Sequence, residues 1–174
     1  MATDLDQLQI FLGNLEWKFQ FREDQNDIIV FFETENFINV NGENFIIVVL
    51  ECTHNGEVLQ IFSPQAYKIP QDPQNKQALF ELLLLLMQDT YFVKFEYFEQ
   101  REEIRICIDL PLEDQDLTEA QLHLCIQNIV KVAEQYHDSI TTTIETGIVQ
   151  REYSQLIIAK TLFDRILEEY QEDI

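Results

Sequence analysis

Two short motifs in the sequence pair a thiol with an imidazole, which is the chemistry of a transition-metal site. They are Cys52-Thr53-His54 and His123-Leu124-Cys125. In a strand, residues two apart share a face, so Cys52 and His54 could approach one ion. In a helix, two residues span about 200° around the axis, so His123 and Cys125 diverge, and the usual zinc spacings are missing. We therefore expect no metal site.

A catalytic nucleophile or acid is not expected either. Cys107 lies on the polar side of an alternating segment, but apart from Arg105 the charges around it are negative, which opposes the thiolate. The carboxylate pairs Glu102-Glu103 and Glu113-Asp114 fall in expected turns, which are usually solvated, whereas a general acid needs a buried carboxyl. A chain with 4 glycines also offers no glycine-rich phosphate loop. We expect a protein that is not an enzyme and holds no cofactor.

The net charge excludes other classes of partner. The chain of 174 residues has 32 acidic and 11 basic residues, a formal charge of -21. Such a surface repels phosphate backbones and anionic lipid, so we expect neither nucleic-acid nor membrane binding. The acidic residues are spread over the whole chain, which is typical of a solvated surface and favours basic protein partners.

The apolar content indicates a folded domain rather than a disordered acidic chain. Hydrophobic residues make up 46% of the sequence, including 13 Phe. Three cysteines, an odd number, sit in apolar runs and are expected to be reduced. The start lacks the pattern of a signal peptide, and the most apolar stretch, 78–87, is too short to span a bilayer and contains Glu81. We expect a cytoplasmic location.

Hydrophobic periodicity predicts an α+β fold with an antiparallel β-sheet and helices packed on it. Apolar residues at helical spacing predict a first helix from Leu5 to Leu15, and alternation then predicts strands. Turn signals at 23–27, Asn41-Gly42 and Asn55-Gly56 separate the strands, and residues 63–70 are expected to be a connector. The expected strands in this half are 17–22, 28–33, 45–51 and 58–62.

The second half of the chain adds helices around one more hairpin. Asp72-Pro73 predicts the start of a helix ending near Met87, and a capping box at Thr118 and Gln121 predicts a long helix ending near Ile140. Between them lies a hairpin of 93–97 and 104–110, and a final helix is expected from about Gln150. The order is α-β-β-β-α-β-β-α, with extra N-terminal strands and a C-terminal helix.

The sequence has more apolar residues than a core on one face of the sheet requires. The strands 28–32 and 45–50 are apolar at consecutive positions, which indicates that both of their faces are covered by helices or by a second subunit. The helix at 78–87 is apolar on nearly every side and is expected to be buried all round. A two-sided core is one explanation; the other is a subunit interface or a groove for a client peptide. The candidate interface or groove residues are Leu84, Leu85, Phe92 and Phe98.

The segment from Phe92 to Leu122 resembles the YbjN-like family, which shares the fold of type III secretion chaperones. The resemblance rests on the strand pair 92–97 and 104–110, the Leu-Pro-Leu-Glu turn at 110–113, and the following 117–122. It extends over about residues 3–140, with Ile69-Pro70 preceding the leucine-rich helix. The resemblance implies a small acidic bacterial protein, usually a homodimer, that binds other polypeptides. The segment after Ile140 and the strands before Phe45 depart from the pattern.

These observations lead to one function hypothesis and two alternatives. We expect residues 1–140 to form a chaperone-like α+β domain, with 141–174 as its C-terminal helical extension. The expected function is non-enzymatic, chaperone-like protein binding, in which apolar grooves or sheet edges hold a polypeptide partner and basic clients are favoured. The alternatives are a regulatory or signalling protein with a single protein partner, whose C-terminal helix acts as a switch or cover, and, remotely, an enzyme of unknown class.

Overall fold

The computed structural model describes residues 4–112 and 117–150, which form parts of two compact units. The first unit consists of Met1–Ile69 and Thr90–Asp138, and the second of Pro70–Asp89 and Ser139–Ile174. Each unit therefore joins two segments that are far apart in the sequence. The division expected from the sequence, 1–140 and 141–174, stays a prediction.

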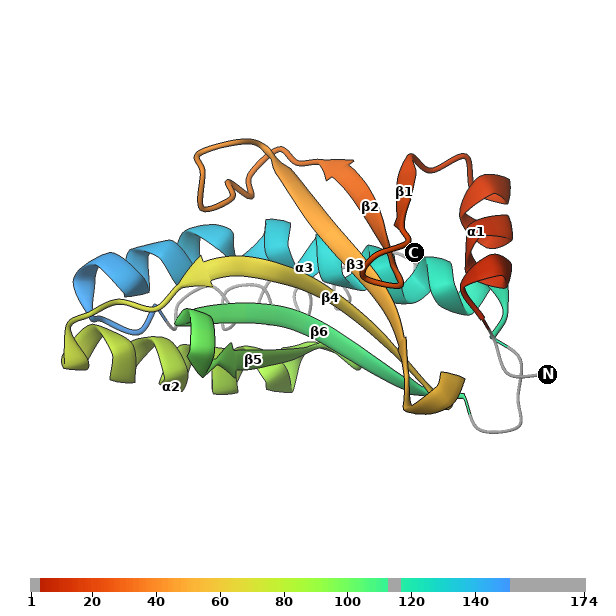
Figure 1. The fold of residues 1–174 in the computed structure, drawn as a ribbon. Helices are drawn as coiled ribbons and strands as arrows, with labels where there is room; N and C mark the ends of the chain where they lie inside the picture. Colours follow the sequence, from red (N-terminus) through yellow and green to blue (C-terminus); the bar gives the residue numbers. More distant parts are fainter. Residues whose placement is uncertain (1–3, 113–116, 151–174) are drawn as a thin grey trace, which may run out of the picture. The chain divides into compact units, whose positions relative to one another are not determined.

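The first unit is built on a six-stranded antiparallel sheet with the order β1-β2-β3-β4-β6-β5 (Figure 1). This arrangement confirms the α+β fold class and the element order predicted from the sequence. The chain runs α1 (Leu5–Asn14), β1 (Phe19–Arg22), β2 (Asp27–Glu33), β3 (Phe45–Thr53), η1 (His54–Gly56), β4 (Val58–Lys68), α2 (Pro73–Asp89), β5 (Lys94–Phe98), η2 (Glu99–Arg101), β6 (Glu103–Pro111) and α3 (Glu119–Thr146).

Three tight connections form the hairpins of the sheet, and each places at least one residue in the left-handed region. Asn26 has φ 53° between β1 and β2, Gly56 has φ 89° between β3 and β4, and Glu102 has φ 51° between β5 and β6. Asn and Gly adopt this conformation readily, whereas a Glu there costs about 1 kcal/mol. The turn residues predicted from the sequence thus lie where the strands reverse.

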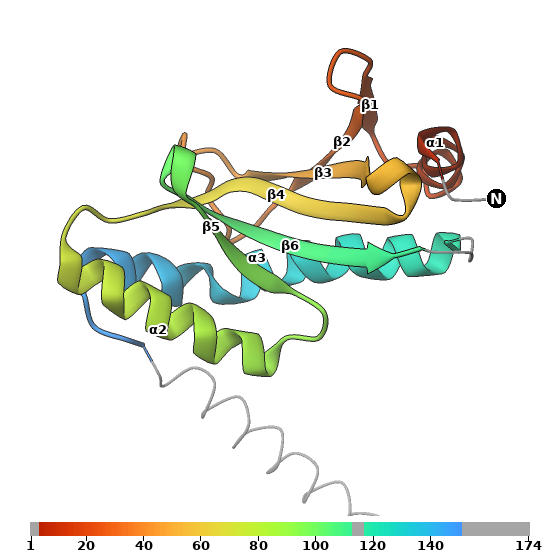
Figure 2. The same ribbon diagram turned by 60° about the horizontal axis from the view of Figure 1, so that its bottom comes forward.

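The sheet has one face against α3 and one turned away from it, which we call the distal face. Figure 2 shows the part of α3 in the first unit running along one side of the sheet. On that side Trp17 stacks on His123 of α3, with ring centroids 5.2 Å apart, and Tyr67 stacks on His137 at 5.9 Å. The isoleucines of β6 that share this face, Ile104, Ile106 and Ile108, are buried. Most of the core therefore lies between the sheet and α3.

A carboxylate on α3 anchors the loop between β2 and β3. The Glu134 side chain accepts hydrogen bonds from the backbone N–H groups of Glu35, Asn36 and Phe37, at 2.6, 2.7 and 3.0 Å. The ring of Phe37, fully buried, then contacts both His137 and Tyr67 edge-on. Partial burial alone would raise the pKa of Glu134, but the three N–H donors and the nearby His137 outweigh it, so this pKa is lowered.

Side-chain caps fix the starts of α1 and α3 in the first unit. The Asp4 carboxylate accepts the N–H of Gln7 at 2.9 Å, at the start of α1. At the start of α3, the Thr118 hydroxyl accepts the N–H of Gln121 at 3.2 Å, while the Gln121 side chain accepts the N–H of Thr118 at 2.9 Å. This reciprocal pair is the predicted capping box.

In the second unit, α2 begins directly after Asp72, whose carboxylate accepts the N–H groups of Gln74 and Asn75. The Asn75 amide then donates to the carbonyl oxygens of Ile144 and Glu145 in the last turn of α3, at 2.9 and 3.2 Å. Gly147 follows with φ 68°, and a Cβ there would collide with the Asn75 side chain. Only glycine fits this close approach, so it ends the helix.

Three expectations about the elements are wrong. The strand β4 does not stop before Ser63 but continues to Lys68. It does so because a bulge absorbs Pro64, which has no N–H for the ladder: four residue steps on β4, from Ser63 to Tyr67, oppose two on β6. The helix α3 also does not end near Ile140 but runs to Thr146.

The third concerns α2, which is not buried all round. Its inner residues Leu79, Leu82, Leu83 and Leu86 are buried, but Leu84 is 66% exposed and Leu85 is half-buried. The final helix expected from about Gln150 lies, apart from its first residue, outside the described residues.

Candidate functional site

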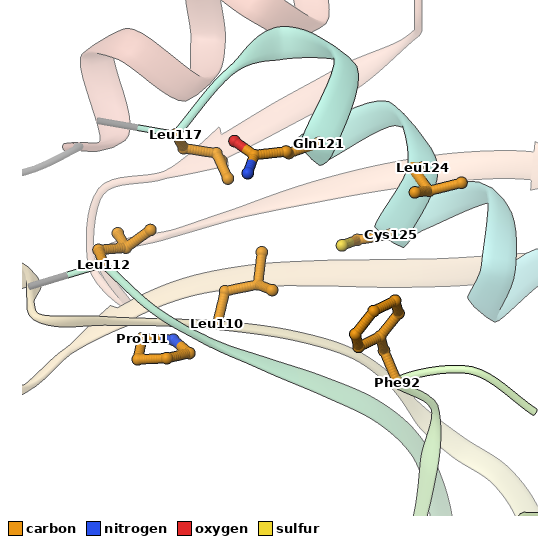
Figure 3. Close-up of a pocket in the computed structure, with 8 residues that line it drawn as sticks. All are labelled: Phe92, Leu110, Pro111, Leu112, Leu117, Gln121, Leu124 and Cys125. Atoms are coloured by element: carbon orange, nitrogen blue, oxygen red, sulfur yellow. The ribbon is translucent and has the colours of Figure 1, made fainter. Parts of the chain in front are cut away.

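An apolar pocket of about 350 Å³ lies in the first unit, between the end of β6 and the first turns of α3 (Figure 3). This volume is at the lower end of the range for small-molecule pockets and suits one or two large apolar side chains. The lining residues are Phe92, Leu110, Pro111, Leu112, Leu117, Gln121, Leu124 and Cys125.

The two walls of the pocket are held by backbone contacts. Pro111 is the last residue of β6 and still pairs with Val58 of β4. The next residue, Leu112, donates its N–H to the carbonyl oxygen of Glu57 at 2.8 Å, which ties the chain to the start of β4. The opposite wall is the first part of α3, where the capping box fixes the helix start. The pocket is thus formed by positioned elements rather than by a free loop.

The rim of the pocket exposes large apolar side chains. Phe92 is 73% exposed and Leu124 is 54% exposed, although both line the same hollow. Phe92 also has φ 65°, in the left-handed region that phenylalanine rarely adopts, and the Thr90 hydroxyl supports this turn by donating to the Val93 carbonyl oxygen at 3.3 Å. A backbone held in this conformation at a cost of about 1 kcal/mol or more keeps the ring at the rim instead of in the core.

The interior of the pocket offers little chemistry. Gln121 uses its side chain in the capping box, and the remaining polar group is the buried thiol of Cys125. Burial raises the pKa of Cys125, so the thiol is protonated at neutral pH and a poor nucleophile. The pocket therefore suits the binding of an apolar group rather than a reaction on it.

The metal-site hypotheses find no support in the described part of the chain. Cys52 is in β3, but His54 lies beyond the strand end in η1 with φ 51°, so the alternation that would bring both side chains to one face stops between them. His123 stacks on Trp17, whereas Cys125 lines the pocket. Among residues 4–112 and 117–150, no three His, Cys, Asp or Glu side chains form a group that could hold an ion.

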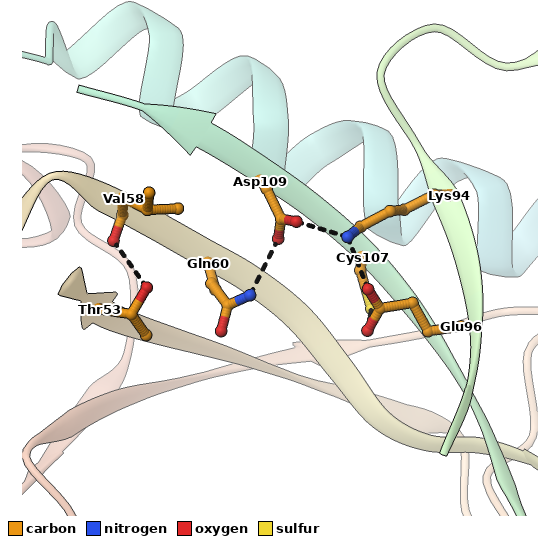
Figure 4. Close-up of polar contacts among 7 residues, drawn as sticks. All are labelled: Thr53, Val58, Gln60, Lys94, Glu96, Cys107 and Asp109. Carbon is orange, nitrogen blue, oxygen red and sulfur yellow. Dashed lines mark hydrogen bonds and ion pairs between the residues drawn. The ribbon is translucent and has the colours of Figure 1, made fainter. Parts of the chain in front are cut away.

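Cys107 is buried on the distal face and is not activated. Its thiol donates a hydrogen bond to the Glu96 carboxylate at 3.4 Å. Burial, followed by the charge of Glu96 and this hydrogen bond, raises the pKa of Cys107 far above its usual value. Lys94 opposes this shift, but its ammonium group is bound to Glu96 and Asp109, as Figure 4 shows.

One carboxylate differs from its expected setting. Glu103 is not a solvated turn residue but the buried first residue of β6, where its Oε1 atom accepts from the Nε of Arg105 at 2.9 Å. The Arg105 guanidinium also lies over the ring of Phe98, 3.7 Å from its centroid. The pair Glu113-Asp114 lies outside the described residues. Glu103 therefore belongs to a structural ion pair on the distal face.

The four candidate interface residues occupy different settings. Phe92 lines the pocket, and Phe98 is half-buried on β5 beneath Arg105. Leu84 and Leu85 belong to the second unit, on the outer side of α2. Of the four, the structure places only Phe92 in the pocket. The other exposed apolar residue at the rim, Leu124, was not among the candidates. The sequence does contain a signal for it, because Leu124 is an apolar residue among the polar positions of its helix.

Within the described residues, no helix combines the length and apolar character needed to cross a membrane. The chain has no match among proteins with curated descriptions. Its fold resembles that of solved structures, and two of them are described here. The first is that of YbjN, "a putative transcription regulator from E. coli", with a TM-score of 0.57, 13% identity, and coverage of 79% of this chain and 94% of that chain.

The second is a chain of the HopA1–SchA chaperone–effector complex, with a TM-score of 0.48, 16% identity, and coverage of 75% of this chain and 90% of that chain. At these identities the likeness concerns the fold alone. The family model described as "YbjN: Putative bacterial sensory transduction regulator" matches residues 4–141, which span most of the chain. The protein therefore belongs to the YbjN family.

Proposed function

We propose that this protein is a non-enzymatic, chaperone-like binding protein that holds a polypeptide partner by receiving one of its large apolar side chains in the pocket. The observation that carries the proposal is the exposure of Phe92 and Leu124 around an apolar hollow of about 350 Å³. Large apolar groups around a concave site are typical of contact surfaces.

The energetics favour a peptide contact of moderate strength. Full burial of a Leu or Phe side chain contributes about 1.5–3 kcal/mol, and the pocket rim would lose exposed apolar surface at the same time. One such anchor gives weak affinity, so a binding segment must add further contacts. The charge of -21 would speed association with a basic segment and repel an acidic one.

A second candidate is a regulatory protein with a single protein partner, and the family's description as a sensory transduction regulator favours it. In that case regulation would act through protein contact, because the net charge opposes direct binding to DNA. The same pocket serves both candidates. They differ in the number of partners: a chaperone-like protein binds several clients, and a regulator binds one. A cytoplasmic location belongs to both proposals.

The test compares two charged substitutions at exposed apolar positions of the first unit. Leu124→Glu places a carboxylate at the pocket rim, and Ile10→Glu is the matched control on α1, where Ile10 is 62% exposed. Partners are isolated with the purified full chain at low salt, and their affinities are then measured by fluorescence anisotropy with labelled peptides from them. We expect Leu124→Glu to weaken binding more than about tenfold and Ile10→Glu to leave it unchanged.

Two outcomes would contradict the proposal: recovery of no polypeptide at low salt, or equal binding by wild type and Leu124→Glu. Recovery of a single partner that is sensitive to Leu124→Glu would favour the regulatory candidate over the chaperone-like one.

A further inference from the structure

The capping box at the start of α3 uses only the oxygen of the Gln121 side chain. Its Oε1 atom accepts two hydrogen bonds, from the Thr118 backbone N–H at 2.9 Å and from the Thr118 hydroxyl at 3.0 Å. Because a backbone N–H can only donate, the oxygen of Gln121 must face the cap, and its Nε2 atom must point away from it. The two N–H bonds of Nε2 make no hydrogen bond to any of the described residues.

This amide nitrogen belongs to the lining of the apolar pocket. In Figure 3 the nitrogen of Gln121 points toward the wall formed by Leu110 and Leu112, whereas the oxygen points away from it. The other lining side chains are apolar except for the Cys125 thiol, which is a weak donor and a weak acceptor. A group that fills the pocket therefore meets one strong side-chain donor, and both lone pairs of the neighbouring oxygen are already used.

The position of this donor restricts the kind of side chain that fits the pocket. The side chain needs a large apolar body for the walls and a hydrogen-bond acceptor for the Gln121 amide. Tyrosine has both, because its phenol oxygen accepts a hydrogen bond. Phenylalanine and leucine fill the hollow but carry no acceptor, and the indole N–H of tryptophan only donates.

The preference for an acceptor comes from the water that a bound side chain displaces. Gln121 is exposed in the free protein, so its N–H bonds are hydrated. A side chain that fills the hollow removes part of this hydration, and a donor left without an acceptor disfavours the complex. For the same reason, sites built to hydrogen-bond a hydroxyl group discriminate against the analogue that lacks it.

We propose that Gln121 selects tyrosine as the side chain that the pocket receives, by donating from Nε2 to the phenol oxygen while Oε1 stays in the capping box. The inference rests on the proposed function, because it takes the pocket as the site that holds a partner's side chain, and it specifies which side chain that is. Gln121 then has two tasks. Its oxygen helps to fix the start of α3, and the same two hydrogen bonds orient its nitrogen toward the pocket.

The test compares two peptide probes that differ by one oxygen atom, acetyl-Lys-Tyr-Lys-amide and acetyl-Lys-Phe-Lys-amide. Their lysines suit the acidic chain and are the same in both probes. Proton–nitrogen correlation NMR of the labelled full chain gives both dissociation constants and also detects the side-chain NH2 group of Gln121. We expect the tyrosine probe to bind about fivefold more tightly, which is the effect of one hydrogen bond, and to shift the Gln121 NH2 resonances more than the phenylalanine probe does.

Gln121→Met removes the donor and keeps the length of the side chain. The Thr118 hydroxyl still accepts the backbone N–H of residue 121, so the main helix cap remains, which thermal unfolding can verify. The preference for the tyrosine probe should fall below about twofold. The matched control is Gln127→Met, at an exposed position of α3 that does not line the pocket, and it should keep the fivefold preference.

Equal dissociation constants of the two probes for wild type would overturn the inference. So would a tyrosine preference that Gln121→Met leaves intact, or the binding of neither probe. Failure of the proposed function has a different signature, because Leu124→Glu tests whether the pocket holds any side chain. If the probes bind wild type equally and Leu124→Glu weakens both, the pocket receives a side chain but Gln121 does not select it.

Discussion

The anchoring of the β2–β3 loop by Glu134 predicts a measurable loss of stability when its carboxylate is removed. Glu134→Ala would leave three backbone N–H groups, of Glu35, Asn36 and Phe37, without their acceptor. The first two contacts are exposed, so water replaces the carboxylate at a cost of roughly 0.5 kcal/mol each, whereas the third is partly buried and costs about 1 kcal/mol. The expected decrease in the free energy of unfolding is therefore about 2 kcal/mol, or about 4–8 °C in Tm.

Urea denaturation followed by the fluorescence of Trp17, the single tryptophan, measures this loss. The matched control is Gln135→Ala, at the next and exposed position of the same helix, which should change stability by less than about 0.5 kcal/mol. Glu134→Gln, which keeps one acceptor oxygen, should lie between Glu134→Ala and wild type. If Glu134→Ala and Gln135→Ala are equally stable, the loop is not held by this carboxylate and the reasoning fails.

The pH dependence of the same contact has a definite sign. Because the pKa of Glu134 is lower in the folded chain than its unfolded value of about 4.3, the stabilisation is complete above that value and is lost as pH falls through the folded pKa. The stability difference between wild type and Glu134→Ala should accordingly shrink in acid. A difference that stays constant in acid would show that the ionised carboxylate is not its source.

Two further predictions concern buried titratable groups. Burial lowers the pKa of His137, although the charges of Asp138 and Glu134 act in the opposite direction. The contribution of His137 to stability is therefore complete above its unfolded pKa of about 6.5 and declines as pH falls. In urea denaturation across this pH range, His137→Phe should remove part of that decline in stability, and an unchanged decline would refute the assignment. The raised pKa and the burial of Cys107 predict that its thiol resists alkylation in the folded protein at neutral pH and reacts once the protein is denatured. Peptide mass spectrometry can follow this alkylation. Rapid labelling of Cys107 in the native state would contradict the prediction.

The parts of the fold that the sequence predicts are those governed by neighbouring residues. The hairpin of β5 and β6 follows from alternation on either side of a short turn, and the start of α3 follows from the capping box at Thr118 and Gln121. These signals act over a few residues, so one chain is enough to read them.

The errors arise where contacts distant in sequence override local preference. Pro64 predicts a strand end, but pairing of Tyr67 with Ile104 resumes beyond the bulge and extends β4. The threonines after Ile140 predict a helix end, yet α3 continues to the hydrogen bonds that its last carbonyl oxygens accept from Asn75. The pairing of Tyr67 with Ile104 and the hydrogen bonds from Asn75 to α3 both join residues far apart in the sequence, so a local sequence pattern cannot show them.

The pocket shows the same limit. Phe92 was a candidate because its apolar side chain exceeded the needs of one strand face, but Leu124 lies more than thirty residues away in the sequence and on another element. Periodicity assigns a residue to one face of its own strand or helix, and it does not show which residues of another element stand opposite. Only the packing of α3 against the end of β6 brings the two to one rim.

The two outer strands bear on how this protein avoids aggregation. A sheet with open edges can grow by strand addition into fibrils, and short, charged edge strands oppose such growth. Here β1 and β5 have 4 and 5 residues, and each carries a cation bound to a carboxylate of the next strand, Arg22 to Asp27 and Lys94 to Asp109. A further chain adding at either edge would have to strip water from these paired charges.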